Sequence, residues 1–231
     1  MKTVAVILGA GQGTRIKGAS IPKQFIKLHG APMIVQTVEK FALINEIEKV
    51  LIVVSKPWMS HAKDIFRDNQ FYEKMVFVEG GVSRQESLFK ACKYIETFIG
   101  REVGVVSHDA ARPFVSLRII EDNISCLKKG YTCDTVLSCT DTIVRTKDGV
   151  EIYDIPNRND LCQGQTPQSF FCSDYIDAYT KIGDQDSITD AAKLLLMSGI
   201  KIKLVPGDPS NLKITTDFDL AFSEFLFSHQ K

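Results

Sequence analysis

The order of elements along the chain predicts an α/β fold with a mostly parallel sheet, helices on both faces and one protruding β-arm. Runs rich in β-branched residues alternate with stretches whose apolar residues recur at helical spacing. Such alternation builds right-handed strand–helix–strand units, which set parallel strands side by side. A single segment, residues 140–166, interrupts the alternation and predicts the arm. The expected architecture is therefore Rossmann-like, with ligands gathered beyond the carboxyl ends of the strands.

In the first half of the chain, short apolar runs mark strands and amphipathic stretches mark helices. Ser83 precedes one amphipathic stretch and is expected to be its N-cap. The expected elements, in order, are a strand at 3–8, a helix at 33–44, a strand at 49–55, a helix at 58–69, a strand at 74–81 and a helix at 84–98.

The second half continues the pattern around the arm. Within 140–166, two short strands around the turn "KDG" predict a hairpin that projects over the active site or onto another subunit. The arm lacks the hydrophobic periodicity of a separate domain, so residues 1–231 are expected to form one domain. The other expected elements are a strand at 102–108, a helix at 117–130, a strand at 133–139, helices at 173–181 and 188–198, a strand at 201–207 and a helix at 216–228.

Composition excludes several classes of protein. Lys and Arg number 28, as do Asp and Glu, and a chain without net charge lacks the basic excess needed for broad nucleic-acid binding. No apolar run approaches the ~20 residues that span a bilayer, so no membrane partner is expected. No CxxC pair occurs among the cysteines, which indicates reduced thiols in a cytoplasmic protein. These are Cys92, Cys126, Cys133, Cys139, Cys162 and Cys172.

A glycine-rich loop follows the first strand, in the stretch "LGAGQGTR". Gly9, Gly11 and Gly13 would let backbone N–H groups close on a phosphate, and Arg15 and Lys23 follow closely. The spacing is neither the dinucleotide fingerprint G-x-G-x-x-G nor a P-loop. A tight turn with solvated basic residues is the alternative interpretation.

The loop, followed by "PKQF", resembles the opening of nucleotidyltransferases of GT-A-like fold that charge sugar or polyol phosphates. The PKQ variant is similar to the cytidylyltransferases that act on methylerythritol phosphate and ribitol phosphate. Gly9 and Ile16 depart mildly from the usual family pattern, but neither change removes a charge.

The resemblance implies two loops that bind CTP. In the second, "GGVSRQES", an arginine and a serine contact the cytidine, although Val82 stands where the family often has an acidic residue or serine. The implied nucleotide-binding residues are Leu8, Gly9, Ala10, Gly11, Gly13, Gly80, Gly81, Arg84, Ser87 and Ala110.

Charged residues elsewhere match the family's catalytic positions. Asp109 follows the strand at 102–108, where its carboxylate would hold Mg²⁺ and lie close to the acceptor. The resemblance assigns catalysis to Arg15, Lys23 and Lys213. His108 is expected to be a half-buried structural residue rather than a general base.

The acceptor site is implied by the same resemblance. Its expected residues are Asp109, Arg112, Thr142, Arg158 and Thr189. In the family the arginine matched by Arg158 reaches the acceptor from a neighbouring subunit, so the arm should build a homodimer. Thr189 is also expected to cap the helix that follows it.

The implied reaction transfers CMP from CTP to a polyol phosphate and releases pyrophosphate. The stretch "QGQTPQSF" resembles the ribitol branch, which makes CDP-ribitol for teichoic acid or capsule. Methylerythritol phosphate, from isoprenoid synthesis, and another pentitol or keto-sugar phosphate are the alternative acceptors. A regulatory module that only binds CTP and a Rossmann dehydrogenase are the alternatives of other classes.

Overall fold

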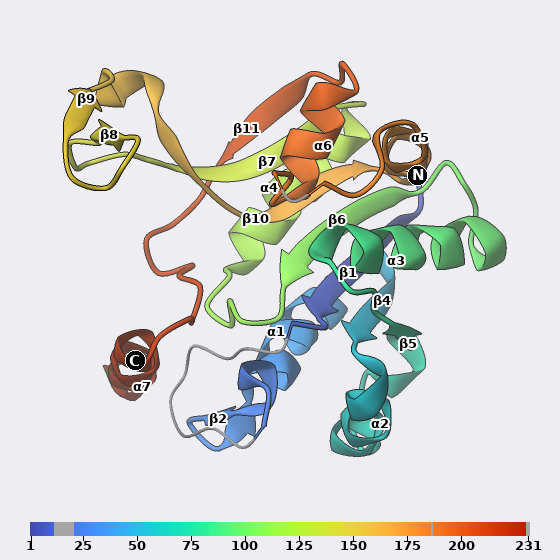
Figure 1. The fold of residues 1–231 in the computed structure, drawn as a ribbon. Helices are drawn as coiled ribbons and strands as arrows, with labels where there is room; N and C mark the ends of the chain where they lie inside the picture. The colour runs from blue at the N-terminus through green and yellow to red at the C-terminus, as the bar shows by residue number, and fades with distance from the viewer. Residues whose placement is uncertain (12–20, 186, 230–231) are drawn as a thin grey trace.

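A seven-stranded sheet forms the centre of the computed structural model, which describes residues 1–11, 21–185 and 187–229 (Figure 1). The strand order is β11-β7-β10-β6-β1-β4-β5, and only β10 runs antiparallel to its neighbours. The strands are β1 (Thr3–Gly9), β4 (Ile47–Val54), β5 (Met75–Glu79), β6 (Gly104–Asp109), β7 (Thr132–Ser138), β10 (Cys162–Phe171) and β11 (Ile202–Pro206).

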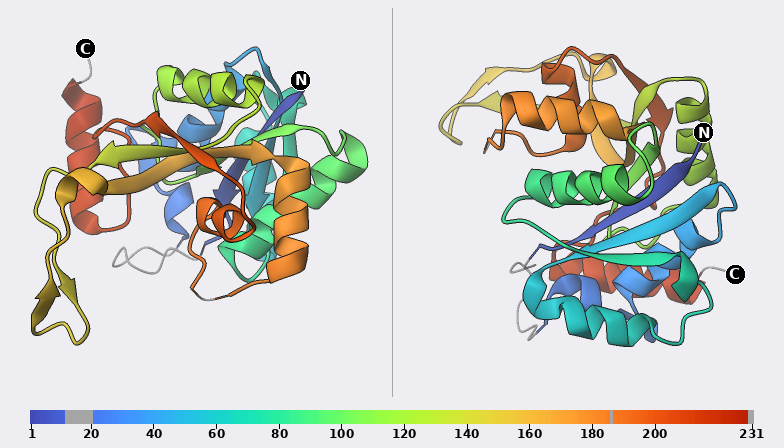
Figure 2. Two further views of the ribbon diagram at one scale, coloured as in Figure 1. Left: turned by 90° about the horizontal axis from the view of Figure 1, so that it is seen from above. Right: turned by 90° about the vertical axis from the view of Figure 1, so that its right-hand side faces the viewer.

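Helices cover both faces of this sheet, as Figure 2 shows from two further directions. One face packs against α1 (Met33–Ala42), α2 (Met59–Phe66) and α4 (Leu117–Lys128). The other packs against α3 (Arg84–Phe98), α5 (Cys172–Ile182) and α6 (Ala191–Met197). The last helix, α7 (Asp217–His229), lies apart from both layers beside the short strands β2 (Lys27–Leu28) and β3 (Ala31–Pro32).

The central strand β1 shows why the sequence forms this arrangement. Ala5 and Ile7 enter the cluster under α1, α2 and α4, whereas Val4 and Val6 enter the cluster under α3, α5 and α6. A strand covered on both sides has no solvent-facing side, so its sequence is a continuous apolar run. The predicted fold class, including the mostly parallel sheet, is confirmed.

Of the two predicted helix N-caps, one is confirmed and one is wrong. Ser83 is the N-cap of α3 as expected, because its hydroxyl accepts a hydrogen bond from the Glu86 N–H. The prediction that Thr189 caps the next helix is wrong. The cap of α6 is Asp190, whose carboxylate accepts from the Lys193 N–H, and Thr189 lies exposed one residue earlier.

Strand β10 is the element that the sequence analysis missed. It inserts between β6 and β7, so the predicted arm, 140–166, extends too far: residues 162–166 begin this central strand. The stretch contains Gly164 and Pro167, which disrupt the usual strand signal.

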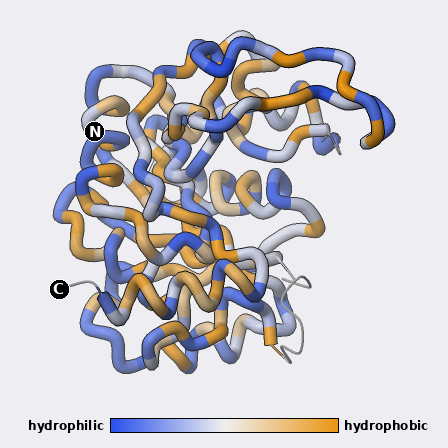
Figure 3. The backbone as a smooth tube through the Cα atoms, turned by 90° about the vertical axis from the view of Figure 1, so that its left-hand side faces the viewer, coloured by the Kyte–Doolittle hydropathy of each residue, from blue (hydrophilic) through white to orange (hydrophobic). Residues whose placement is uncertain are grey.

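The arm projects from the end of the sheet as a hairpin of β8 (Arg145–Thr146) and β9 (Ile152–Asp154). The predicted turn is present, and Gly149 in "KDG" has a φ of 79° that favours glycine. Figure 3 shows hydrophobic stretches on this projection. Four large apolar side chains on it are more than half exposed: Val150, Ile152, Tyr153 and Ile155. Within the residues described, no helix is long and apolar enough to cross a membrane.

Candidate functional site

The first glycine loop and the loop after β6 meet at the carboxyl edge of the sheet. Leu8 pairs with Asp109 in the register of β1 and β6, and the Ala110 N–H donates to the Leu8 carbonyl at 3.0 Å. A Cβ added to Gly9 would lie 3.4 Å from the Ala110 Cβ. The same Cβ would lie only 3.0 Å from Ile34 Cδ1 and 3.3 Å from the Val53 carbonyl oxygen, so the close packing of this position against α1 and β4 favours glycine.

Gln24, in the quoted "PKQF", holds the described part of the first loop. Its buried Nε2 donates to the carbonyls of Gly9 at 2.6 Å and Gly11 at 3.1 Å. Sequence reasoning singled out the neighbouring Lys23 and missed this glutamine, because no local sequence pattern marks it. Two predicted site residues, Gly13 and Arg15, lie outside the described residues.

The second glycine loop follows β5 and packs against the first. A Cβ on Gly80 would lie 2.5 Å from the Ala10 Cβ, so this contact requires glycine. The Ser87 hydroxyl accepts from the Gly81 N–H at 2.9 Å and donates to the Ser83 carbonyl at 2.7 Å. Ser87 thus fixes the loop, and the predicted nucleotide-binding residues described on both loops are brought together.

Three cations surround the carboxylate of Asp109. Arg84 Nη2 lies 3.5 Å from Oδ1, while Lys213 Nζ and Arg112 Nε lie 3.0 Å and 3.3 Å from Oδ2. They come from α3, the segment before α7, and the loop after β6. The arrangement concentrates positive charge where the predicted nucleotide loops meet.

The protonation of Asp109 is set by two opposing effects. Burial by itself would raise the pKa of Asp109, but the charges of Arg84, Lys213 and Arg112 outweigh burial and hold it well below its usual range. The side chain is therefore a carboxylate at any physiological pH. An anion in this position offsets part of the surrounding positive charge.

Lys23 is tied to the same region by the segment after β11. Its Nζ donates to the carbonyl of Ile214 at 2.8 Å, next to Lys213 in sequence. The Ile214 N–H donates to the Ala111 carbonyl at 2.9 Å, and Arg112 Nη1 donates to the Asn211 carbonyl at 2.8 Å. Segments almost two hundred residues apart in sequence thus bring Lys23, Lys213 and Asp109 into one region.

His108 is structural, as predicted, but it is fully buried rather than half-buried. Its Nε2 donates to the Arg112 carbonyl at 3.1 Å, and its Nδ1 accepts from the Thr166 hydroxyl at 2.9 Å. The same hydroxyl accepts from the Asp109 N–H at 3.2 Å. Desolvation lowers the pKa of His108 to about 3, so the ring is neutral and fixes the backbone around Asp109.

The neutral state of His108 predicts a pH-dependent stability. An unfolded histidine gains a proton below about pH 6.5, whereas His108 in the folded protein does not do so until about pH 3. Folding stability should therefore fall as pH drops, by about 2 kcal/mol from this residue between pH 7 and pH 5. Urea unfolding of wild type and His108→Gln at both pH values measures it.

Comparing wild type with His108→Gln separates the contribution of His108 to the pH dependence from that of the other titrating groups, which both proteins share. Burial raises the pKa of Asp134 to about 6, which acts in the opposite direction over part of this range but is common to both proteins. If His108→Gln loses as much stability as wild type between pH 7 and pH 5, the buried neutral ring does not account for the loss.

The remaining acceptor residues are not joined to this cluster. Thr142 is exposed at the base of the arm, and Arg158 Nη1 donates to the Thr140 carbonyl at 3.0 Å. Thr189 is exposed, but its neighbours are tied to the site region through Gln85 and Gln168. Among the described residues, no hydrogen bond or ion pair links Thr142, Arg158 or Thr189 to Asp109.

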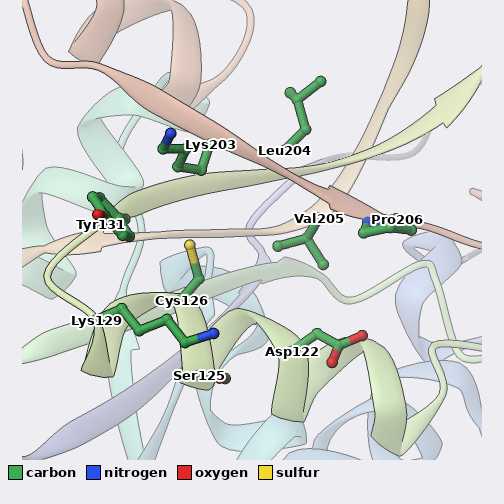
Figure 4. Close-up of a pocket in the computed structure, with 9 residues that line it drawn as sticks. All are labelled: Asp122, Ser125, Cys126, Lys129, Tyr131, Lys203, Leu204, Val205 and Pro206. Carbon is green, nitrogen blue, oxygen red and sulfur yellow. The ribbon is translucent and has the colours of Figure 1, made fainter.

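A surface hollow of about 320 Å³ lies elsewhere, between α4 and the sheet-edge strand β11 (Figure 4). Cys126 and Lys129 line it from the helix side, and Lys203 from the strand. No predicted site residue lines this hollow, so it does not mark the site formed by the loops.

The geometry of the site does not specify the reaction, but comparison with known proteins identifies the family. The family model described as IspD, 2-C-methyl-D-erythritol 4-phosphate cytidylyltransferase, matches residues 3–229. The chain belongs to the IspD family. A ribitol-5-phosphate cytidylyltransferase of Streptococcus pneumoniae (strain Hungary19A-6) is 40% identical over 226 residues, which cover 95% of this chain and 96% of that protein. The predicted family and enzyme class, a cytidylyltransferase among the nucleotidyltransferases, are confirmed.

Solved structures of the IspD family share the whole fold. The 4-diphosphocytidyl-2C-methyl-D-erythritol synthase of Anaerococcus prevotii DSM 20548 aligns with a TM-score of 0.84 at 27% identity, covering 99% of each chain. The 2-C-methyl-D-erythritol 4-phosphate cytidylyltransferase of Francisella tularensis aligns with a TM-score of 0.81 at 26% identity, covering 97% of this chain and 99% of that one.

Proposed function

We propose that this member of the IspD family transfers CMP from CTP to ribitol 5-phosphate, giving CDP-ribitol and pyrophosphate. The cluster of Arg84, Arg112 and Lys213 around Asp109 carries the proposal, because transfer between two anions needs concentrated positive charge. The choice of ribitol 5-phosphate rests on the 40% identical relative that bears that name.

The acceptor needs no strong general base in this reaction. A phosphate oxygen of ribitol 5-phosphate, already anionic, attacks the α-phosphorus of CTP. The bond from that phosphorus to the bridging oxygen breaks, and pyrophosphate leaves with the electron pair. The neutral, buried His108 is consistent with such a mechanism, since its ring nitrogens are both occupied.

In this proposal Lys23 and Arg15 neutralise charge on the transferring nucleotide, and Lys213 and Arg112 hold the acceptor phosphate. Asp109 keeps Arg84, Arg112 and Lys213 pointed at one place, because all three lie within 3.5 Å of its two oxygens. Positioning of this kind supplies most of the catalysis in nucleotidyl transfer.

The site suits a magnesium ion that is bound by one protein carboxylate together with phosphate oxygens of the substrate. The described residues hold no cluster of three or more His, Cys, Asp or Glu side chains suited to a metal. Mg²⁺ is, however, commonly bound by one carboxylate together with substrate phosphate oxygens. We propose Asp109 as that carboxylate, with the ion supplying further neutralisation of the triphosphate when CTP is bound.

Pyrophosphate release from CTP tests the proposed function directly. Purified enzyme with CTP and Mg²⁺ should release pyrophosphate fastest with ribitol 5-phosphate and much more slowly with 2-C-methyl-D-erythritol 4-phosphate or another pentitol phosphate. Preference for the methylerythritol substrate would refute the acceptor assignment. Tight CTP binding without release for any acceptor would instead indicate a regulatory module.

The arm supports a proposed homodimer. Val150, Ile152, Tyr153 and Ile155 expose apolar area on a hairpin that projects from the sheet, and a large exposed apolar patch is typical of an interaction surface. In a twofold dimer the arm of one subunit would reach the partner, where Arg158 could contact the acceptor phosphate.

The six unpaired cysteines fit the reducing cytoplasm, where we expect the enzyme to act.

Mixing two inactive variants tests whether Arg158 acts across the subunit boundary. Lys23→Ala and Arg158→Ala should each be nearly inactive alone. After the subunits of a 1:1 mixture are exchanged, about half the dimers are mixed, and one of their two sites keeps both wild-type residues. Pyrophosphate release should then recover to about a quarter of the wild-type rate.

The oligomeric state gives the control for this experiment. Ile152→Asp should convert the dimer to a monomer in sedimentation and abolish the recovery. Equal inactivity of the mixture before and after exchange, in dimers shown to have exchanged, would place Arg158 outside the neighbouring subunit's site.

A further inference from the structure

A row of polar side chains crosses one face of the sheet where the surrounding residues are apolar. Asp134 on β7 pairs with Gln168 on β10, and Gln168 pairs with Ser107 on β6, so the three side chains lie on one face. This is the face that buries Val105 and Phe170 against α3, α5 and α6. Polar groups in such a place require partners or a ligand.

Hydrogen bonds connect this row to the site around Asp109. Gln168 Nε2 donates to Asp134 Oδ1 at 3.1 Å, and Gln168 Oε1 accepts from Arg84 Nη2 at 3.4 Å. The same Arg84 nitrogen lies 3.5 Å from Asp109 Oδ1. Asp134 is thus linked to the reacting region through two side chains, and the proposed reaction does not use it.

Two atoms on the row are buried and have no protein partner among the described residues. They are Ser107 Oγ and Arg84 Nη1. A buried donor without a partner is costly, so water or a ligand is expected to satisfy it. Ser107 precedes Asp109 by two residues on β6, and Arg84 Nη1 belongs to the guanidinium that contacts both Asp109 and Gln168, so both atoms lie at the Asp109 end of the row.

The far end of the row is open. A Cβ added to exposed Gly164 would meet only Asp134 Oδ2 within 4 Å, at 4.0 Å. Leu204, which pairs with Asp134 on the edge strand β11, is 63% exposed. Room therefore exists beside Oδ2 of a carboxylate whose pKa is raised to about 6 by burial.

We propose that Asp134 is a specificity-determining residue whose carboxylate accepts hydrogen bonds from hydroxyl groups of the acceptor's polyol chain. The inference rests on the proposed function, because it takes the phosphate end of the acceptor to lie at Lys213 and Arg112. The polyol chain then runs past Arg84 and Gln168 towards β7. A carboxylate accepts two hydroxyl hydrogens readily, which suits a chain of adjacent hydroxyls and not an apolar substituent.

A comparison of acceptors that lack single hydroxyls tests this role. Wild type should lose about 10–100-fold in kcat/KM when ribitol 5-phosphate is replaced by the singly deoxygenated form lacking the hydroxyl that Asp134 binds. In Asp134→Asn the same replacement of substrate should lower kcat/KM only a few-fold, because the variant already lacks the carboxylate that accepts the hydrogen bond from this hydroxyl. The KM for CTP should stay unchanged, since Asp134 lies at the acceptor end.

A second variant keeps the test independent of any misfolding of Asp134→Asn. Gly164→Val adds bulk to the open space beside Oδ2, where the protein has room for it. It should keep the wild-type unfolding midpoint and lower kcat/KM for ribitol 5-phosphate about tenfold. Asp122→Asn, at an exposed ion pair on α4, is the matched control and should behave as wild type.

Equal losses for wild type and Asp134→Asn with every deoxygenated acceptor would overturn the inference, as would unchanged kcat/KM in Gly164→Val. Failure of the proposed function gives a different result. Wild type would then turn over another polyol phosphate in preference to ribitol 5-phosphate, and the same comparison would be made with deoxygenated forms of that acceptor.

Discussion

Replacing Lys23 with alanine should lower kcat by about 10²–10³-fold, because a positioned cation at the transferring phosphorus is lost. Lys23 lies directly after Pro22, and its Nζ bonds the Ile214 carbonyl beside Lys213 at 2.8 Å. This tie fixes the ammonium group next to the acceptor-binding segment before substrate arrives. CTP affinity should fall much less than kcat, since the glycine loops supply contacts of their own. Steady-state pyrophosphate release and calorimetric CTP binding measure the two effects.

Lys27→Ala is the matched control for this variant. Lys27 lies four residues further on, and its side chain is exposed on β2, so its removal should leave kcat at the wild-type value. A wild-type kcat in Lys23→Ala would contradict its assigned role. A parallel loss of CTP affinity and kcat would instead mean that Lys23 binds the ground state and the transition state equally.

The fold was predicted well wherever a strand is buried on both faces. In a strand such as β1, burial on both faces requires a continuous apolar run, which is visible in the sequence alone. The predicted positions of such strands therefore agree with the structure within a few residues. Strand β10 is different because four of its six buried residues are polar. Gln165 and Gln168 satisfy partners on other segments, including Asp208 and Arg84, so a central strand carried the pattern of a loop.

The sequence predicts the charged residues of the site but not the amide side chains that hold its loops. Asp109 and Lys213 could be singled out from the sequence because a strand end and a recognisable motif mark them. Gln24 and Asn211 could not, although Gln24 fixes the first glycine loop and Asn211 Nδ2 donates to the Thr166 carbonyl at 2.8 Å. Their role depends on which carbonyls the fold brings near, and no local pattern encodes that.

Asp109→Asn should lower kcat/KM by about 10²–10³-fold and destabilise the fold by about 3–5 kcal/mol. The amide cannot neutralise Arg84, Arg112 and Lys213, which remain clustered around a buried position. Their mutual repulsion then displaces the side chains that bind both substrates. Steady-state kinetics and urea unfolding at pH 7 measure the two losses in the same preparation.

The pH dependence of that stability difference identifies its cause. The neighbouring cations hold the pKa of Asp109 well below its usual range, so the carboxylate's contribution is complete above about pH 4 and is lost as pH falls further. The gap between wild type and Asp109→Asn should therefore be constant from pH 7 to about pH 5 and narrow in more acidic solution. Asp122→Asn breaks an ion pair with Arg118 whose side chains are about half exposed, and it should cost less than about 1 kcal/mol. A gap that stays constant into strong acid would mean that packing, rather than the charge of Asp109, holds the three cations in place.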